Sequence, residues 1–122
     1  MLYFSSKALF VCLRYAYALA RLLRNFFGHY LLVGYRPINK NDKEKLTHKL
    51  AEILDTVNFL HPFREGNGRT QREFLRLLAK EKGWTLNLTP PDDTEVYERY
   101  MTGTVNADVD ALATLISECL NM

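Results

Sequence analysis

The sequence lacks the features that mark disulfide-rich and membrane-spanning proteins. It has only two cysteines, Cys12 and Cys119, which could pair but fit a reducing compartment at least as well. No run of about 20 apolar residues is free of charge, because three arginines interrupt the apolar stretch 8–33. The 122 residues, 48% hydrophobic and 25% charged, have the composition of one ordinary soluble globular domain.

Acidic residues are absent from the first 41 positions. This part has a charge of +6, whereas the remainder, which holds all 14 acidic residues, has a charge of −4. Four basic residues recur at spacings that place them on one helical face, opposite a broad apolar face: Lys7, Arg14, Arg21 and Arg24. We interpret residues 1–33 as a basic apolar helical segment whose stripe faces solvent. A membrane-surface helix, a mitochondrial-type leader and a nucleic-acid-binding stripe are weaker alternatives.

Apolar residues recur at helical spacing through most of the remaining chain, which predicts an all-α, or mostly α, fold. The clearest pattern follows Asp42, a suitable N-cap, and comprises Leu46, Leu50, Ile53, Leu54, Val57 and Leu60. A second helix is expected over 69–82, before the stop signal Gly83, with an apolar arc of Phe74, Leu75, Leu77, Leu78 and Ala79. Shorter helices are expected over 95–101 and 108–120, and extended chain or turn over 34–42 and 84–88.

The segment between the two main helices, residues 61–72, has the most specific pattern in the chain: HPFREGNGRTQR. Because Pro62 disfavours helical backbone before it, the first helix should end at His61 and present this side chain. Gly66 and Gly68 permit positive φ and close backbone approach, so that N–H groups around Asn67 can turn inward as an anion-binding nest. The next helix should begin near Gly68, with its positive dipole end toward the same anion.

The charged residues of this segment fit phosphate chemistry. Arg69 and Arg72 share one helical face, so that two guanidinium groups can converge on phosphate oxygens. Glu65 is the only carboxylate of the loop and suits Mg²⁺, which binds one or two carboxylates together with phosphate oxygens. His61 alone titrates near neutral pH and is the candidate general base. Each residue alone has an ordinary structural explanation, but the combined spacing favours a polyphosphate site.

Residues 61–72 match the pattern H-P-F-x-E-G-N-G-R-x-x-R without departure, and the chain therefore resembles the Fic domain family. The resemblance implies a protein adenylyltransferase of the bacterial effector or toxin branch, which transfers AMP from Mg-ATP to a Ser, Thr or Tyr hydroxyl of a target protein. It further implies that His61 deprotonates the target hydroxyl and that Glu65 holds Mg²⁺. Residues Gly66, Asn67 and Gly68 would cradle the α-phosphate, Arg69 and Arg72 would bind the outer phosphates, and Phe63 would anchor the loop.

The resemblance also implies a Fic-type helical bundle with at most a short β-hairpin flap. We expect one Fic-like domain over 1–122, truncated before the motif: a flap-like segment over 34–42, a motif-bearing core over 43–88 and C-terminal helices over 89–122. After Thr114 and Glu118, Cys119 stands where the family's inhibitory helix has Gly or Asn, and we regard this likeness as chance. If the chain is regulated, we expect the inhibitor to be an antitoxin-like partner or another part of a larger protein.

Two other functions stay open at this stage. One is a truncated or inactive Fic-like protein that binds nucleotide without modifying a target. The other is an adaptor for a membrane surface or for nucleic acid that works through the basic stripe, although no sequence-specific nucleic acid contact is expected. The expected location is the bacterial cytoplasm, or a host cell if the protein is a translocated effector.

Overall fold

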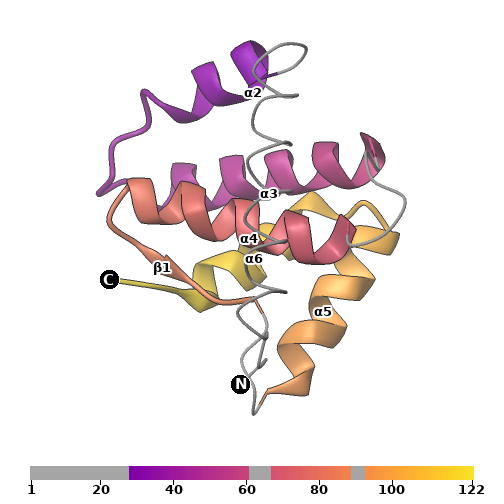
Figure 1. Cartoon of the computed structure of the whole chain (residues 1–122). Coiled ribbons are helices and arrows are strands. Elements are labelled where there is room, and N and C mark those ends of the chain that lie inside the picture. Colours follow the sequence, from indigo (N-terminus) through magenta and orange to yellow (C-terminus); the bar gives the residue numbers. More distant parts are fainter. Residues whose placement is uncertain (1–27, 61–66, 89–92) are drawn as a thin grey trace, which may run out of the picture.

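The computed structural model describes residues 28–60, 67–88 and 93–122 (Figure 1). This part of the chain forms five helices and one two-stranded antiparallel sheet. The elements follow one another as α2 (Gly28–Tyr35), α3 (Lys43–Leu60), α4 (Asn67–Glu81), β1 (Thr85–Leu86), α5 (Thr94–Val105), α6 (Val109–Cys119) and β2 (Leu120–Asn121). The prediction of a mostly α fold is confirmed.

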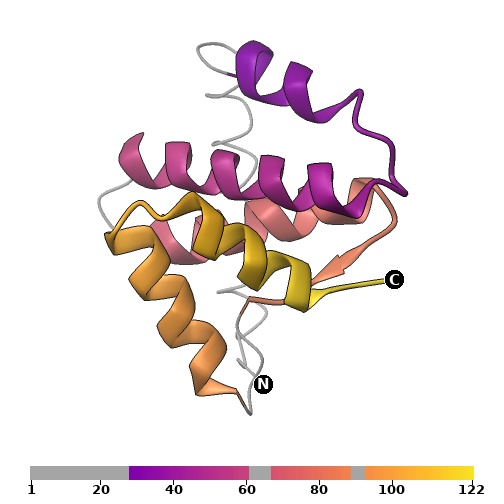
Figure 2. The same cartoon turned by 180° about the vertical axis from the view of Figure 1, so that it is seen from behind.

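Helix α3 lies at the centre of this arrangement. It begins where the sequence predicted, because the Asp42 carboxylate accepts a hydrogen bond from the Lys45 amide (3.2 Å) and so caps the first turn. Its predicted apolar stripe is buried at Leu46, Leu50, Ile53, Leu54 and Val57. The helix packs most extensively against α6 and also against α4 and α2, so that α2 lies on one side of it and α4 and α6 on the other (Figures 1 and 2).

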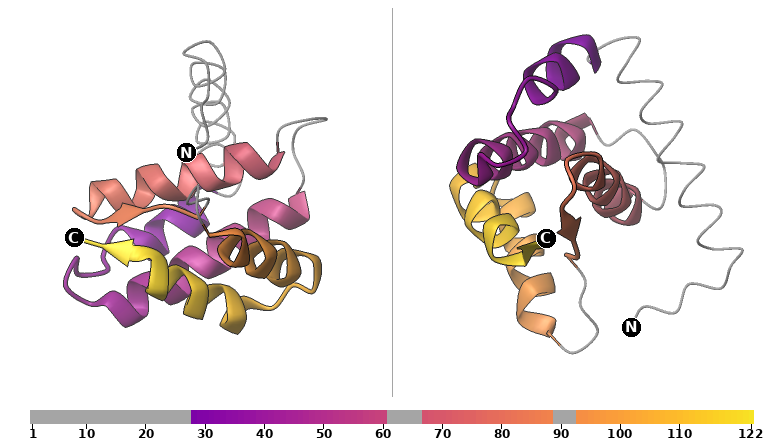
Figure 3. Two further views of the ribbon diagram at one scale, coloured as in Figure 1. Left: turned by 90° about the horizontal axis from the view of Figure 1, so that it is seen from below. Right: turned by 90° about the vertical axis from the view of Figure 1, so that its left-hand side faces the viewer.

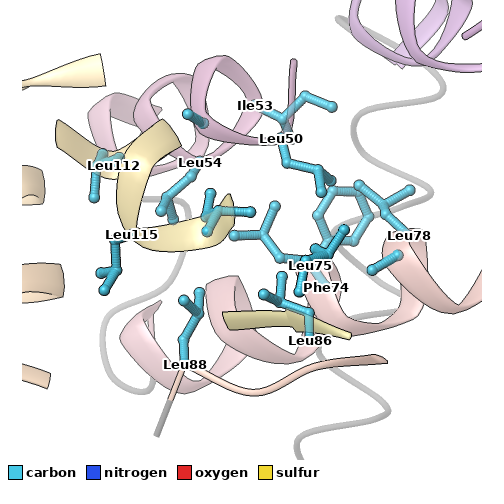
Figure 4. Close-up of a cluster of buried hydrophobic side chains, with 14 of the residues drawn as sticks. Leu50, Ile53, Leu54, Phe74, Leu75, Leu78, Leu86, Leu88, Leu112 and Leu115 are labelled. Atoms are coloured by element: carbon cyan, nitrogen blue, oxygen red, sulfur yellow. The ribbon is translucent and has the colours of Figure 1, made fainter. Parts of the chain in front are cut away.

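Helix α4 supplies the other half of the core. Phe74, Leu75, Leu78 and Ala79 are buried as predicted, whereas Leu77 is half-buried. Figure 4 shows the α4 side chains meeting those of α3, with leucines of α6 and of the segment after α4 closing the cluster. Burial of this continuous apolar surface is the main force that holds the helices together.

The end of α4 leads into the short sheet. Gly83 has a φ of +82°, which only glycine adopts without strain, and it turns the chain out of the helix as predicted. Strand β1 then pairs with β2, with Thr85 opposite Asn121 and Leu86 opposite Leu120. The extended piece after α4 was predicted, but its partner at the end of the chain was not. Both leucines are buried, so the sheet closes one end of the core (Figure 3).

The flap-like segment differs from the prediction at its start. Gly34 and Tyr35 belong to α2 instead of extended chain, because the Tyr35 ring is fully buried and its hydroxyl donates to the Leu78 carbonyl of α4. Residues 36–42 form turns, and none of them is in a strand. The chain after α4 holds these turns: Lys82 Nζ donates to the carbonyls of residues 36 and 38 (2.8 Å each) and the Trp84 indole to that of residue 40 (2.7 Å).

Helices α5 and α6 run in roughly opposite directions and are joined by a tight turn (Figure 2). Helix α5 continues to Val105, four residues beyond its predicted end, because packing against α6 overrides the low helix propensity of residues 102–104. Asp93 and Asp108 cap the two helices. Among residues 28–60, 67–88 and 93–122, no helix combines the length and the apolar character that crossing a bilayer requires.

Candidate functional site

The predicted site is only partly within the described residues. His61, Phe63, Glu65 and Gly66 lie outside them. Asn67 is the first residue of α4, and Gly68, Arg69 and Arg72 follow on its first two turns. The predicted helix start near Gly68 is therefore confirmed, and it brings the two arginines to the N-terminal end of a helix whose other end is fixed in the core.

The N-terminal end of α4 suits an anion. Its first turn contains no acidic residue, so no carboxylate within that turn neutralises the positive end of the helix dipole. The first carboxylate of the helix, Glu73, is engaged by Arg76, whose Nε lies 3.0 and 3.1 Å from the two carboxylate oxygens. Arg69 is exposed and Arg72 is half-buried on the neighbouring turn.

The backbone of Gly68 lacks the positive φ that the sequence pattern allowed for it. Within the described residues, Gly83 is the only glycine with positive φ, so Gly68 does not supply a left-handed turn. A Cβ atom at position 68 would lie 3.2 Å from Nη1 of Arg72, which is tighter than most Cβ contacts, so the guanidinium would have to shift slightly. Glycine at this position therefore leaves room for the Arg72 guanidinium.

Two tyrosines of α5 face Arg72. The guanidinium carbon lies 5.2 Å from the centre of the Tyr100 ring and 5.8 Å from that of Tyr97. The two rings are 6.5 Å apart and inclined by 29°. The two distances from the guanidinium carbon to the ring centres are within the range of a cation–π interaction. Tyr100 is 2% exposed and Tyr97 46% exposed, so Arg72 spans a buried and an open ring.

A chain of side-chain hydrogen bonds joins α5, α4 and α3 beside this arginine. The Tyr100 hydroxyl donates to Oε1 of Gln71 (2.7 Å), Gln71 Nε2 donates to Oδ1 of Asn58 (3.2 Å), and Asn58 Nδ2 donates to the Thr104 carbonyl (3.1 Å). Gln71 is 3% exposed, so the bond from Tyr100 is buried, whereas the two bonds of Asn58 are partly buried. Burial raises the pKa of Tyr100 above its ordinary value, and the charge of Arg72 partly offsets that rise. The Tyr100 hydroxyl therefore remains a donor through the physiological range.

Helix α6, which carries the partial match to an inhibitory helix, is engaged elsewhere. Glu118 pairs with Arg99 of α5, beside a surface depression of about 540 Å³ that Asp93 and Cys119 also line. The interpretation of this likeness as chance is consistent with that contact, since Glu118 has a partner other than the motif arginines. Across the described ranges no group of three metal-ligating side chains is present, and the predicted Mg²⁺ ligand Glu65 lies outside these ranges.

The sequence interpretation missed Gln71 and Asn58. A signal was available, because Gln71 occupies the position that begins the buried series 71, 74, 75 and 78 on α4. An amide at an apolar-face position needs a buried partner. The partner itself could not be inferred from spacing, since Gln71 meets residues 13 and 29 positions away.

Comparison with known proteins gives a consistent result. The family model described as Fic/DOC matches residues 6–79. A protein adenylyltransferase of Bartonella henselae is 37% identical over 83 residues, which cover 65% of this chain and 14% of that protein. A probable protein adenylyltransferase of Sinorhizobium fredii is 32% identical over 80 residues, 66% of this chain and 40% of that protein. The protein adenylyltransferase VbhT of Bartonella schoenbuchensis is 44% identical over 46 residues, 38% of this chain and 10% of that protein. The chain thus matches less than half the length of each of these relatives.

Proposed function

The chain belongs to the Fic/DOC family, and on that basis we propose that it is a protein adenylyltransferase. It transfers AMP from Mg-ATP to a Ser, Thr or Tyr hydroxyl of a target protein. The observation that carries this proposal is the arrangement at the start of α4, where Gly68, Arg69 and Arg72, the last fixed residues of an intact family motif, lie on the first two turns. The relatives named protein adenylyltransferase support the same reaction.

The proposed reaction divides between the loop and the helix. His61 accepts the proton of the target hydroxyl, whose oxygen attacks the α-phosphorus in line while pyrophosphate leaves. Gly66, Asn67 and Gly68 hold the α-phosphate through backbone N–H groups, and Arg69 and Arg72 bind the β- and γ-phosphates. Phe63 anchors the loop against the core. Glu65 would hold Mg²⁺, which neutralises phosphate charge when bound, and a single carboxylate beside a polyphosphate is a donor set that fits this ion.

The packing of α4 supports this assignment. Catalysis of phosphoryl-type transfer depends mainly on positioning and on preorganised charge. The helix that carries both arginines is buried along Phe74, Leu75 and Leu78, so its N-terminal end cannot move freely relative to α3. A ligand bound there would meet donors whose positions the core already determines.

Several further properties are part of the proposal. The 122 residues act as one Fic-like unit in which the turns over 36–42, directly after α2, form the shortened flap region. The partners are a target protein bearing a hydroxyl side chain and an antitoxin-like inhibitor, and the location is the bacterial cytoplasm or a host cell. A second function, nucleotide binding without transfer, is favoured by one observation: residues 36–42 form turns and no strand to which a target chain could be added.

The two functions are separated by incubating the purified chain with labelled ATP, Mg²⁺ and bacterial or host lysate. Adenylyl transfer gives labelled protein bands that disappear in His61→Ala. The matched control is His48→Ala, which removes an exposed histidine of α3 that pairs with Glu52, away from the motif. Bands that persist in His61→Ala would refute the assigned base. ATP binding without any labelled band would support the second function.

A further inference from the structure

The contact between Arg72 and two aromatic rings has a consequence for the proposed site. We propose that Tyr97 and Tyr100 are positioning residues that hold the Arg72 guanidinium ready for the outer phosphates of the nucleotide. This inference rests on the proposed function, since that function assigns the outer phosphates to Arg72. It adds two residues outside the motif, from a helix that begins 22 positions after Arg72.

An aromatic ring can hold an arginine in place without neutralising its charge, which a carboxylate cannot do. An arginine is usually held in place by a carboxylate, but a carboxylate neutralises the positive charge and competes with phosphate for the same N–H donors. A ring face attracts the guanidinium through its quadrupole without neutralising its charge. The Tyr100 hydroxyl is also close enough to accept one N–H of Arg72, and the remaining donors are left for a ligand. Within the described part of the chain, no ion pair involves Arg72.

The two rings have different degrees of freedom. Tyr100 is buried, and its hydroxyl is bonded to Gln71, the residue next to Arg72 on α4. The position of this ring relative to the start of α4 is therefore fixed by the hydrogen bonds that reach Asn58. Tyr97 lies one turn earlier on α5, is 46% exposed and covers the guanidinium from the open side. Tyr97 can thus be changed without opening the core.

The test compares ATP with AMP, because only ATP carries the outer phosphates. Tyr97→Leu keeps an apolar side chain but removes the ring, and we expect the dissociation constant for Mg-ATP to rise about two- to five-fold, the value of an exposed cation–π contact. The affinity for AMP should not change. Tyr97→Phe retains the ring and should bind ATP as the unmodified chain does. Met101→Leu is the matched control, an exposed apolar residue one turn further along α5.

A double substitution decides whether Tyr97 acts through Arg72. In an Arg72→Gln background, Tyr97→Leu should have no further effect on ATP affinity. The inference is wrong, and Tyr97 contacts the nucleotide directly, if Tyr97→Leu weakens the binding of AMP as much as that of ATP. The same conclusion follows if Tyr97→Leu still weakens ATP binding in the Arg72→Gln background.

The position of Arg72 can also be measured without nucleotide. The aromatic rings should shift the NMR resonances of the Arg72 δ-methylene protons upfield, and Tyr97→Leu should reduce this shift whereas Tyr97→Phe should not. Unchanged resonances in Tyr97→Leu would overturn the inference. If the Tyr97 variants show these resonance changes but the unmodified protein binds no ATP, the proposed function is refuted and the contact with Arg72 is not. Failure of the inference and failure of the proposed function can therefore be told apart.

Discussion

The hydrogen bonds of Gln71 lead to a quantitative prediction for stability. We expect Gln71→Leu to destabilise the protein although leucine is an excellent residue for a buried helix position. The substitution removes the bond from the Tyr100 hydroxyl and the bond to Asn58. The loss therefore depends on what happens to the two groups left behind, and the structure distinguishes them by burial.

The magnitude follows from that difference. Tyr100 is 2% exposed, so in Gln71→Leu no water can replace Gln71 as the acceptor for its hydroxyl. A buried donor without a partner costs about 1–3 kcal/mol. Asn58 is half-buried, so loss of the second bond does not strand a fully buried group and costs about 1 kcal/mol. The free energy of unfolding should fall by about 2–4 kcal/mol.

Urea unfolding followed by helical circular dichroism measures this change, with the slope checked for two-state behaviour. The decisive control is the double variant Gln71→Leu with Tyr100→Phe, which removes the stranded hydroxyl as well as its acceptor. Replacing both partners of a buried hydrogen bond by apolar groups of similar shape costs much less than replacing one. The double variant should be at least as stable as Gln71→Leu alone. A loss equal to the sum of the two single substitutions would refute the reasoning.

Three further predictions test other parts of the structure. Gly103→Ala would place a Cβ atom 2.6 Å from Cδ2 of the buried Leu112; overpacking costs about 1–3 kcal/mol and exceeds the gain of about 1 kcal/mol in helix propensity, so calorimetry should show a lower Tm. Burial, and secondarily the charge of Glu81, raises the pKa of Tyr35 above its ordinary value of 10.0. The neutral Tyr35 hydroxyl therefore contributes its full stabilisation below pH 10, and this contribution is lost as the pH rises further. Tyr35→Phe removes the titrating group, so the unfolding free energy of this variant should fall less steeply between pH 9 and about 11, by at most about 1.4 kcal/mol per pH unit. Glu118→Gln removes the surface ion pair with Arg99. It should change stability by less than about 1 kcal/mol and leave the proposed adenylyl transfer unchanged, and a marked gain of transfer would identify Glu118 as an inhibitory glutamate.

The helices that carry the motif were predictable because their patterns are long and regular. The series from Leu46 to Val57 repeats at helical spacing over several turns, and each of its members is buried in the structure. The stop at Gly83 was predictable for another local reason, the need for positive φ. Such features depend only on residues that are close in the sequence, so a sequence pattern predicts them.

The features that the sequence did not reveal depend on distant contacts. Helix α5 continues through Gly103 because the missing side chain lets it approach Leu112 of α6. Strand β2 has two residues, too few to show an alternating pattern, and exists because Leu86 lies opposite Leu120. The support of Arg72 joins α4 to α5 across 25 and 28 positions, from residue 72 to residues 97 and 100. No local pattern encodes which ring meets which arginine.

The core extends well past the end of the family match, and this limits how the motif could be moved between proteins. The match stops at residue 79, but the apolar faces of α3 and α4 share their core with later residues: Leu86, Leu112 and Leu115, which Figure 4 shows, and Ile116 and Leu120. A chimaera that takes over residues 43–79 alone would carry the arginines on a helix pair with an unsealed interior. The transferable unit is the motif together with the C-terminal helix pair, so in recombination or in protein engineering the last 40 residues should be inherited together with residues 43–79 as one piece.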